Sequence, residues 1–174
     1  MSELLSGKRI LITQADQFMG PMLCEVLRAK GATVIADDSD LSMAGVAEKV
    51  VADSGRIDVL VANLSIPAPS TPAAQVSEEE WQAVFAALVS PLPRLCAAVL
   101  PQMVERRAGK ILLMGSASAL RGMKRASTYS AARGAQLAYI QAVGVEMAEH
   151  NIQINAIAQN FVENPTYFPP EVQA

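Results

Sequence analysis

The sequence predicts a single α/β domain with a doubly wound parallel sheet. Short apolar runs alternate with longer segments of helical periodicity along the chain, a pattern typical of βαβ units with right-handed crossovers. The 174 residues suit one hydrophobic core. Hydrophobic residues make up 51% of the chain and charged residues 18%, which favours a buried core over disorder. Since the chain contains no internal repeat or linker, we expect one domain over residues 1–174.

The first half of the chain contains three predicted strands and two predicted helices. Pro21 suits the first turn of a helix and Gly31 is a common terminator, so these residues bound the first helix. Residues 57–63 form a continuous apolar run, which indicates a strand buried on both faces of a parallel sheet. In chain order, the expected elements are a strand at 9–13, a helix at 21–31, a strand at 32–36, a helix at 43–54 and a strand at 57–63.

The second half of the chain continues the alternation after a proline-containing loop. Ser77 and Glu80 have the spacing of a capping box at the start of a long helix. Pro91 and Pro93 lie inside this helical segment and are expected to kink or break it. In chain order, the expected elements are a helix at 77–107, a strand at 110–116, a helix at 127–149 and a strand at 152–158. From Asn160 onwards we expect loop.

Composition and charge exclude several classes of protein. The net charge is −3 with acids and bases mixed, so neither nucleic acid nor a membrane surface is an expected partner. Uninterrupted apolar stretches are about strand length, shorter than the ~18 residues that span a bilayer, and the first residues lack a signal-peptide pattern, so we expect a cytoplasmic protein. Cys24 and Cys96 stand among apolar helical neighbours and are expected as buried free thiols. No cluster has metal-ligand spacing, and the single histidine, His150, does not suggest a Ser–His arrangement.

A serine, a tyrosine and an arginine follow the fourth predicted strand at a spacing that suits proton transfer. Ser116 ends that strand, where open parallel sheets carry their site residues. Tyr129 and Arg133 are four residues apart in a predicted helix and therefore share one face. A guanidinium close to a phenol favours the phenolate, so this arrangement predicts a tyrosine base. The alternative is an exposed Tyr–Arg pair on a surface helix.

The turn after the first strand lacks the glycines of a dinucleotide-binding loop. Such loops need glycines because backbone amides must approach a pyrophosphate closely. Only Gly20 is present in this turn, while Gln14 adds bulk, Asp16 adds negative charge and Phe18 fills space. Packing of Phe18 in the core is an alternative interpretation of that residue. In either case the sequence predicts that NAD(P) does not bind.

These motifs resemble the short-chain dehydrogenase/reductase superfamily of Rossmann-like folds and, within it, the cofactor-free halohydrin dehalogenases. That branch is marked by Thr-x4-Phe/Tyr-x-Gly and by Ser-x12-Tyr-x3-Arg. The matching residues are Thr13, Phe18, Gly20, Ser116, Tyr129 and Arg133. Oxidoreductases of the superfamily instead carry loop glycines, a Lys four residues after the Tyr, and an Asn in the helix where this chain has Leu88. Their Asn-Asn-Ala-Gly motif is reduced to residues 63–66, Asn-Leu-Ser-Ile.

The resemblance covers essentially the whole chain and is greatest to the B-type members. The short stretch between the second and third predicted strands leaves room for one helix, so the third strand of the usual superfamily sheet is expected to be absent. Family members usually continue well beyond the equivalent of Ala174, so the resemblance implies a chain truncated at its C-terminus.

The resemblance also implies a reaction, in which a vicinal haloalcohol closes to an epoxide and releases halide, with small anions opening the ring in reverse. Tyr129 would be the general base, Ser116 the hydrogen-bond donor to the substrate oxygen and Arg133 the cation beside Tyr129. No cofactor is implied. The halide and substrate pocket would be formed by Phe18, Gln159, Asn160, Phe161, Val162 and Tyr167. The long helices resemble those of superfamily interfaces, which implies a homodimer or homotetramer.

Two alternatives remain open. The first is an NAD(P)-dependent short-chain oxidoreductase with a degenerate glycine loop, which keeps the serine and the tyrosine. The second is a non-catalytic subunit in which the three residues are vestigial.

Overall fold

The computed structural model of the chain describes residues 4–160. Five parallel strands form one sheet in the order β2-β1-β3-β4-β5, so the predicted doubly wound α/β fold is confirmed. The strands are β1 (Arg9–Thr13), β2 (Thr33–Asp37), β3 (Val59–Ala62), β4 (Gly109–Met114) and β5 (Ile152–Ile157). The helices are α1 (Gly20–Ala29), α2 (Val46–Ser54), α3 (Glu78–Leu88), α4 (Pro91–Glu105), α5 (Ser118–Arg121) and α6 (Ser127–Met147), with short 3-10 helices η1 (Ala73–Gln75) and η2 (Ala148–His150).

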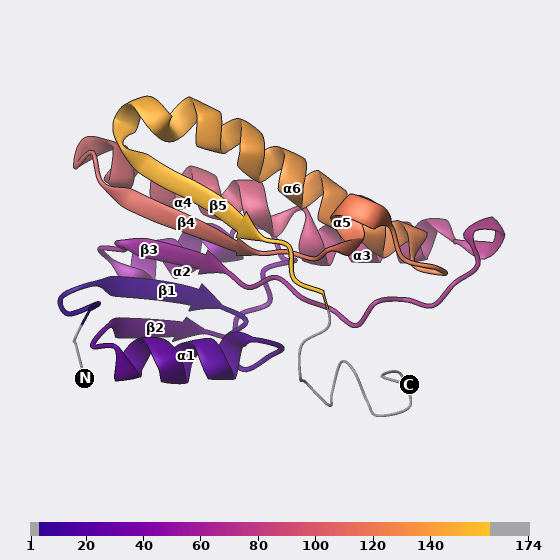
Figure 1. The fold of residues 1–174 in the computed structure, drawn as a ribbon, viewed down its shortest axis with the longest axis horizontal. Helices are drawn as coiled ribbons and strands as arrows, with labels where there is room; N and C mark the ends of the chain where they lie inside the picture. The colour runs from indigo at the N-terminus through magenta and orange to yellow at the C-terminus, as the bar shows by residue number, and fades with distance from the viewer. Residues whose placement is uncertain (1–3, 161–174) are drawn as a thin grey trace.

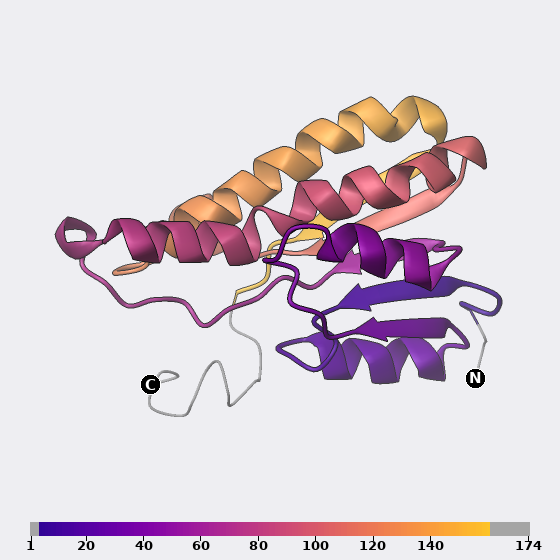
Figure 2. The same ribbon diagram turned by 180° about the vertical axis from the view of Figure 1, so that it is seen from behind.

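Helices cover both faces of the sheet because successive strand side chains point to opposite sides. In β1, Leu11 faces the larger core, while Ile10 and Ile12 belong to a second cluster with Cys24 of α1. The larger core also contains buried apolar residues of α2, α4 and α6. Figure 1 shows α1 along β2 and α6 along β5, and Figure 2 shows α3, α4 and α6 from behind. Two packed layers therefore enclose the central strands.

The order of the strands creates a crevice at the carboxyl ends of β1 and β3. The chain passes from β1 to β2 on one side and then returns to pair β3 with the other side of β1. Ligands of open α/β sheets bind where the strand order reverses in this way. Between β2 and β3 the described residues form the helix α2 and no strand, as the short spacing predicted.

The long predicted helix is divided in two, as its prolines indicate. Helix α3 ends at Leu88 and α4 begins at Pro91, since a proline nitrogen cannot donate the hydrogen bond of a continuous helix. The predicted cap is also present, because the Ser77 hydroxyl accepts a hydrogen bond of 3.1 Å from the amide of Glu80.

Helices α3 and α4 together contain the most apolar long segment of the described residues. The 28 residues Glu78–Glu105 are long and apolar enough, by length and composition only, to cross a membrane. Scattered polar residues divide this segment into uninterrupted apolar runs of about strand length. Such a helix is weak evidence of a membrane span, since core helices pass the same test. In this fold α4 contributes Leu92, Leu95 and Val99 to the core.

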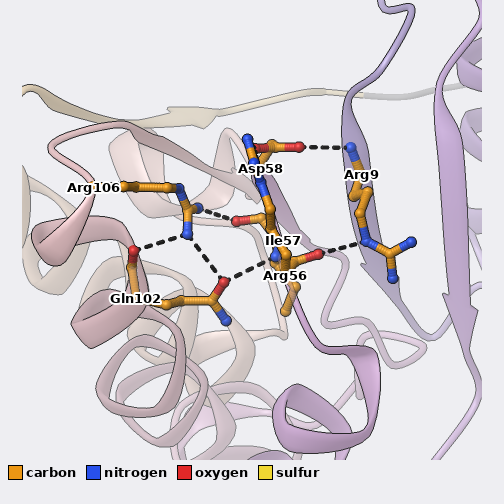
Figure 3. A network of polar contacts seen from close by, with 6 residues as sticks. All are labelled: Arg9, Arg56, Ile57, Asp58, Gln102 and Arg106. Carbon is orange, nitrogen blue, oxygen red and sulfur yellow. Dashed lines mark hydrogen bonds and ion pairs between the residues drawn. The ribbon is translucent and has the colours of Figure 1, made fainter.

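A polar network connects the amino-terminal ends of the central strands to α4. It lies at the end of the strands opposite to the crevice. Figure 3 draws its members, which are Arg9, Arg56, Ile57, Asp58, Gln102 and Arg106. The carboxylate of Asp58 accepts hydrogen bonds from the Arg9 amide at 2.9 Å and from the Arg56 guanidinium at 2.8 Å. Gln102 of α4 accepts from the Ile57 amide at 2.9 Å. These contacts fix the start of β3 against β1 and α4.

Candidate active site

A cavity of about 410 Å³ opens at the carboxyl ends of the central strands. Ser116, Tyr129 and Arg133 all line it, together with Phe18 and Asn160. The other lining residues come from the loop after β3 and from the segment between β4 and α6, which includes α5, and they are Ser65, Ile66, Pro67, Ala68, Pro69, Ser70, Ser118, Arg121, Gly122, Met123, Lys124 and Ala126. The fold therefore brings together five residues that the sequence predicted for the site, although they lie as far apart as positions 18 and 160.

Ser116 is held so that its own proton can point into the cavity. It lies just beyond β4, where the Gly115 amide still donates to the Ile157 carbonyl at 2.9 Å. The Ser116 oxygen accepts from the Ser118 amide at 3.2 Å and from the Ser118 hydroxyl at 3.0 Å. Because a hydroxyl has one proton and two lone pairs, two accepted bonds leave the proton of Ser116 available as a donor.

Tyr129 and Arg133 form a stacked pair on α6. The guanidinium carbon of Arg133 lies 5.0 Å from the centre of the Tyr129 ring, within the range of a cation–π contact. Arg133 is only 2% exposed, so the alternative of an exposed surface pair is wrong. A buried cation next to a phenol stabilises negative charge on it more strongly than a solvated cation does.

The Arg133 side chain is anchored by three oxygens. One guanidinium nitrogen, Nη1, donates to the Leu64 carbonyl at 2.8 Å, the Met114 carbonyl at 3.2 Å and the Gln136 side-chain oxygen at 3.0 Å. Leu64 lies two residues after β3 and Met114 ends β4, and these two strands are paired neighbours in the sheet. These contacts fix the cation at the base of the cavity without a carboxylate partner among the described residues.

The first turn is shaped as if for glycine but carries two large side chains. Gln14 and Phe18 have φ angles of 45° and 51°, a conformation that non-glycine residues rarely adopt. The Gln14 side-chain oxygen accepts from the Ser65 amide at 2.6 Å, which links the end of β1 to the loop after β3. Phe18 lines the cavity. Position 20 requires a glycine, because a Cβ at this position would lie 2.5 Å from the Gln14 carbonyl oxygen.

The residues of this turn do not fit a dinucleotide. A pyrophosphate needs bare backbone amides at the positions that Gln14 and Phe18 fill. The amide of Asp16 already donates to the carboxylate of Asp38 at 3.0 Å, so this amide is occupied and faces negative charge. This turn therefore presents a carboxylate pair, Asp16 and Asp38, and two large side chains where a diphosphate-binding loop has glycines and free amides.

The predicted halide loop is described only in part. Asn160 lines the cavity and accepts a hydrogen bond from the Arg121 side chain. Gln159 does not line the cavity, although its carbonyl accepts from the Ala117 amide at 2.7 Å and its buried side-chain nitrogen has no hydrogen-bond partner among the described residues. The predicted residues Phe161, Val162 and Tyr167 lie outside the described part of the chain.

Some residues at the site were not predicted from the sequence. Ser65, Arg121 and Lys124 line the cavity, and Gln136 contacts Arg133 from one helical turn further along α6. The i,i+3 spacing of Arg133 and Gln136 was the available signal for that contact. Among residues 4–160 no group of three His, Cys, Asp or Glu side chains could hold a metal. Cys24 and Cys96 are buried free thiols, as predicted.

Comparison with known proteins places the chain among short-chain dehydrogenases, and both reductases and a dehalogenation enzyme are similar to it. A family model described as short chain dehydrogenase matches residues 38–168. The 5-keto-D-gluconate 5-reductase of Escherichia coli K12 is 32% identical over 97% of this chain and 74% of its own length. The 3-oxoacyl-[acyl-carrier-protein] reductase of the same strain is 27% identical over 90% of this chain and 74% of its own length. A solved structure described as "Dehalogenation enzyme" superposes with a TM-score of 0.88 at 29% identity, covering 98% of this chain and 79% of that one.

Proposed function

The chain belongs to the short-chain dehydrogenase family, and from that premise we propose that it is a cofactor-independent halohydrin dehalogenase. It converts vicinal haloalcohols to epoxides with release of halide, and small anions open the ring in reverse. The observation that carries the proposal is the first turn, where Gln14 and Phe18 occupy glycine-like conformations in place of the glycines of a dinucleotide loop, and Phe18 lines the cavity. The dehalogenase among the structural neighbours supports it.

The second candidate is an NAD(P)-dependent oxidoreductase. The names of the sequence relatives favour this function over the dehalogenase function, because both are reductases. Ser116 and Tyr129 are compatible with it. The first turn and the buried Arg133 are the features that oppose it, since the Asp16 amide already donates to Asp38 and the positions of Gln14 and Phe18 carry side chains where a pyrophosphate loop needs glycine.

The residues of the cavity suit each step of the dehalogenation. Tyr129, as phenolate, takes the proton of the substrate hydroxyl, and Ser116 donates a hydrogen bond to the same oxygen. The alkoxide attacks the neighbouring carbon, the carbon–halogen bond breaks, and halide leaves with the bonding electrons. Arg133 stabilises the phenolate before the transfer. Base catalysis by a positioned side chain is worth about 10²–10⁴-fold, and alignment of the reacting atoms adds to it.

Halide release requires a place for the anion. Under this proposal Phe18 and the loop 159–162, with Tyr167 as a further wall, form that place, and the partners are a small haloalcohol or epoxide and a halide ion. The proposal also includes a homodimer or homotetramer in the cytoplasm, without nucleic acid or membrane partners.

Halide release from 1,3-dichloro-2-propanol, measured without added cofactor, tests the proposal. Tyr129→Phe is expected to lower this activity by at least ~100-fold, because it removes only the hydroxyl of the base. Unfolding curves of the variant and the wild type serve as the control for an intact fold. If the protein releases no halide but oxidises NADPH with a keto substrate, the oxidoreductase function replaces the dehalogenase function.

A further inference from the structure

We propose that Gln136 is a positioning residue that ties the guanidinium of Arg133 to the backbone at the break between α3 and α4. It thereby fixes the cation against the ring of Tyr129. This inference rests on the proposed function, because Tyr129 and Arg133 are its base and its cation.

Gln136 bridges two groups that come from different elements. Its side-chain oxygen accepts from Nη1 of Arg133 at 3.0 Å, and its side-chain nitrogen donates to the Leu88 carbonyl at 2.5 Å. Gln136 is 0% exposed, so water cannot replace either bond. A buried polar group that loses its partner costs about 1–3 kcal/mol, which makes the Leu88 end of this bridge selective for a side chain that can donate; at the other end, Nη1 of Arg133 keeps two carbonyl acceptors for its two hydrogens.

The Leu88 carbonyl is available because the helix is interrupted there. Pro91 has no amide hydrogen to donate, and the Leu92 amide donates to Val89 at 3.2 Å. Gln136 fills this gap from α6. The interruption between α3 and α4 therefore supplies a rigid anchor for the site. This anchor, the Leu88 carbonyl, lies 48 residues away in sequence from Gln136.

A neutral amide is the side chain that serves both ends. A glutamate at this position would place negative charge 3 Å from the guanidinium and offset its field at Tyr129. An aliphatic residue would leave the Leu88 carbonyl unpaired and the Arg133 nitrogen with two acceptors instead of three. Glutamine holds the guanidinium in place and leaves its positive charge intact.

Other charged groups line the same cavity as Tyr129 or bond to its neighbour in the chain, and the test must separate them from Gln136. Arg121 and Lys124 line the same cavity from the loop after β4. The carboxylate of Glu80 accepts from the Thr128 hydroxyl at 2.8 Å, next to Tyr129 in the chain. Among the described residues none of these groups forms a hydrogen bond with Gln136, whose partners are Arg133 and Leu88, so a change at Gln136 is expected to reach Tyr129 through Arg133.

The test compares Gln136→Glu with Gln141→Glu, which adds the same charge at an exposed position of the same helix. Two quantities are measured on the full chain, namely the pH dependence of kcat/KM for halide release and the ultraviolet titration of tyrosinate. Subtracting the titration of Tyr129→Phe isolates Tyr129. For Gln136→Glu both midpoints should move up by about one pH unit, and for Gln141→Glu they should stay within a few tenths of a unit.

Unchanged midpoints in Gln136→Glu, or an equal shift in Gln141→Glu, would overturn the inference. If Gln136→Glu does not fold, Gln136→Met decides: a roughly tenfold loss of kcat with KM within about twofold supports the positioning role, and an unchanged kcat refutes it. If the wild type releases no halide at all, the proposed function fails, while the tyrosinate titration still decides whether Gln136 controls the field of Arg133.

Discussion

Gln14 and Phe18 hold backbone conformations that L residues rarely adopt, with φ angles of 45° and 51°. Such a conformation costs about 1–2 kcal/mol per residue, and strain of this kind persists where side chains have a role. Gln14 has an evident structural role, because its side-chain oxygen accepts a hydrogen bond from the Ser65 amide. Phe18 lines the cavity, which makes it the better probe of function.

Replacement of Phe18 by glycine should therefore separate stability from function. Phe18→Gly relieves the strained φ but adds flexibility to the unfolded chain, and these effects offset each other to within about 1 kcal/mol. Halide affinity should nevertheless fall at least ~10-fold, since the anion loses a wall of its site. Urea unfolding and halide inhibition of epoxide formation measure the two quantities. A variant with wild-type halide inhibition would remove Phe18 from the halide site.

At the scale of elements, the network of Figure 3 makes the stability of the sheet depend on pH. Burial acts to raise the pKa of Asp58, but hydrogen bonds from the Arg9 amide and Arg56, with the nearby charge of Arg106, outweigh it and hold this pKa below its ordinary value. A lowered pKa in the folded protein stabilises it above the unfolded pKa, and this contribution is lost as the pH falls through the folded value.

Asp58→Asn should accordingly destabilise the protein at pH 7 by about 2 kcal/mol. The difference in free energy of unfolding from wild type should shrink as the pH falls below ~4. Denaturant unfolding at several pH values measures it. Asp53→Asn is the matched control, because Asp53 pairs with Lys49 on the exposed surface of α2 and such pairs contribute about 0.3–0.5 kcal/mol. A difference for Asp58→Asn that does not change with pH would contradict the assigned charge.

The elements also show what the sequence can and cannot predict. The apolar periodicity predicted the five strands, and the prolines predicted the break at Pro91. Both features depend on local sequence. Helix α5 was not predicted, since four residues are too few to show a helical period. Ser116, Tyr129 and Arg133 were found from their spacing, and they line one cavity. The bridge from Gln136 to Leu88 was not predictable, because it depends on how α6 packs against the end of α3.

At the scale of the whole molecule, the parallel sheet separates two kinds of polar site. The arginine network lies at the amino ends of the strands, and the cavity lies at their carboxyl ends. All five strands within residues 4–160 run in one direction, so the order of the elements decides which loops meet at the cavity. A ligand of this cavity contacts loops after β1, β3, β4 and β5 together and should stabilise the fold as a unit.

Ligand-induced stabilisation distinguishes the two candidate functions directly. A ligand that binds only the folded state at a hundredfold excess over its Kd adds about 2.7 kcal/mol, or roughly 5–10 °C in Tm for a chain of this size. If the cavity holds halide, bromide should raise Tm in a saturable way, whereas NADPH should leave it unchanged because Gln14 and Phe18 replace the glycines that a pyrophosphate needs. Sulfate and fluoride at matched ionic strength control for screening, which any salt produces alike.

Phe18→Gly should lose most of the bromide-induced rise in Tm, while its own Tm without bromide stays close to that of wild type. A saturable rise with NADPH and none with bromide would instead identify a nicotinamide cofactor as the ligand, and Arg133 would then have to be explained within an oxidoreductase site.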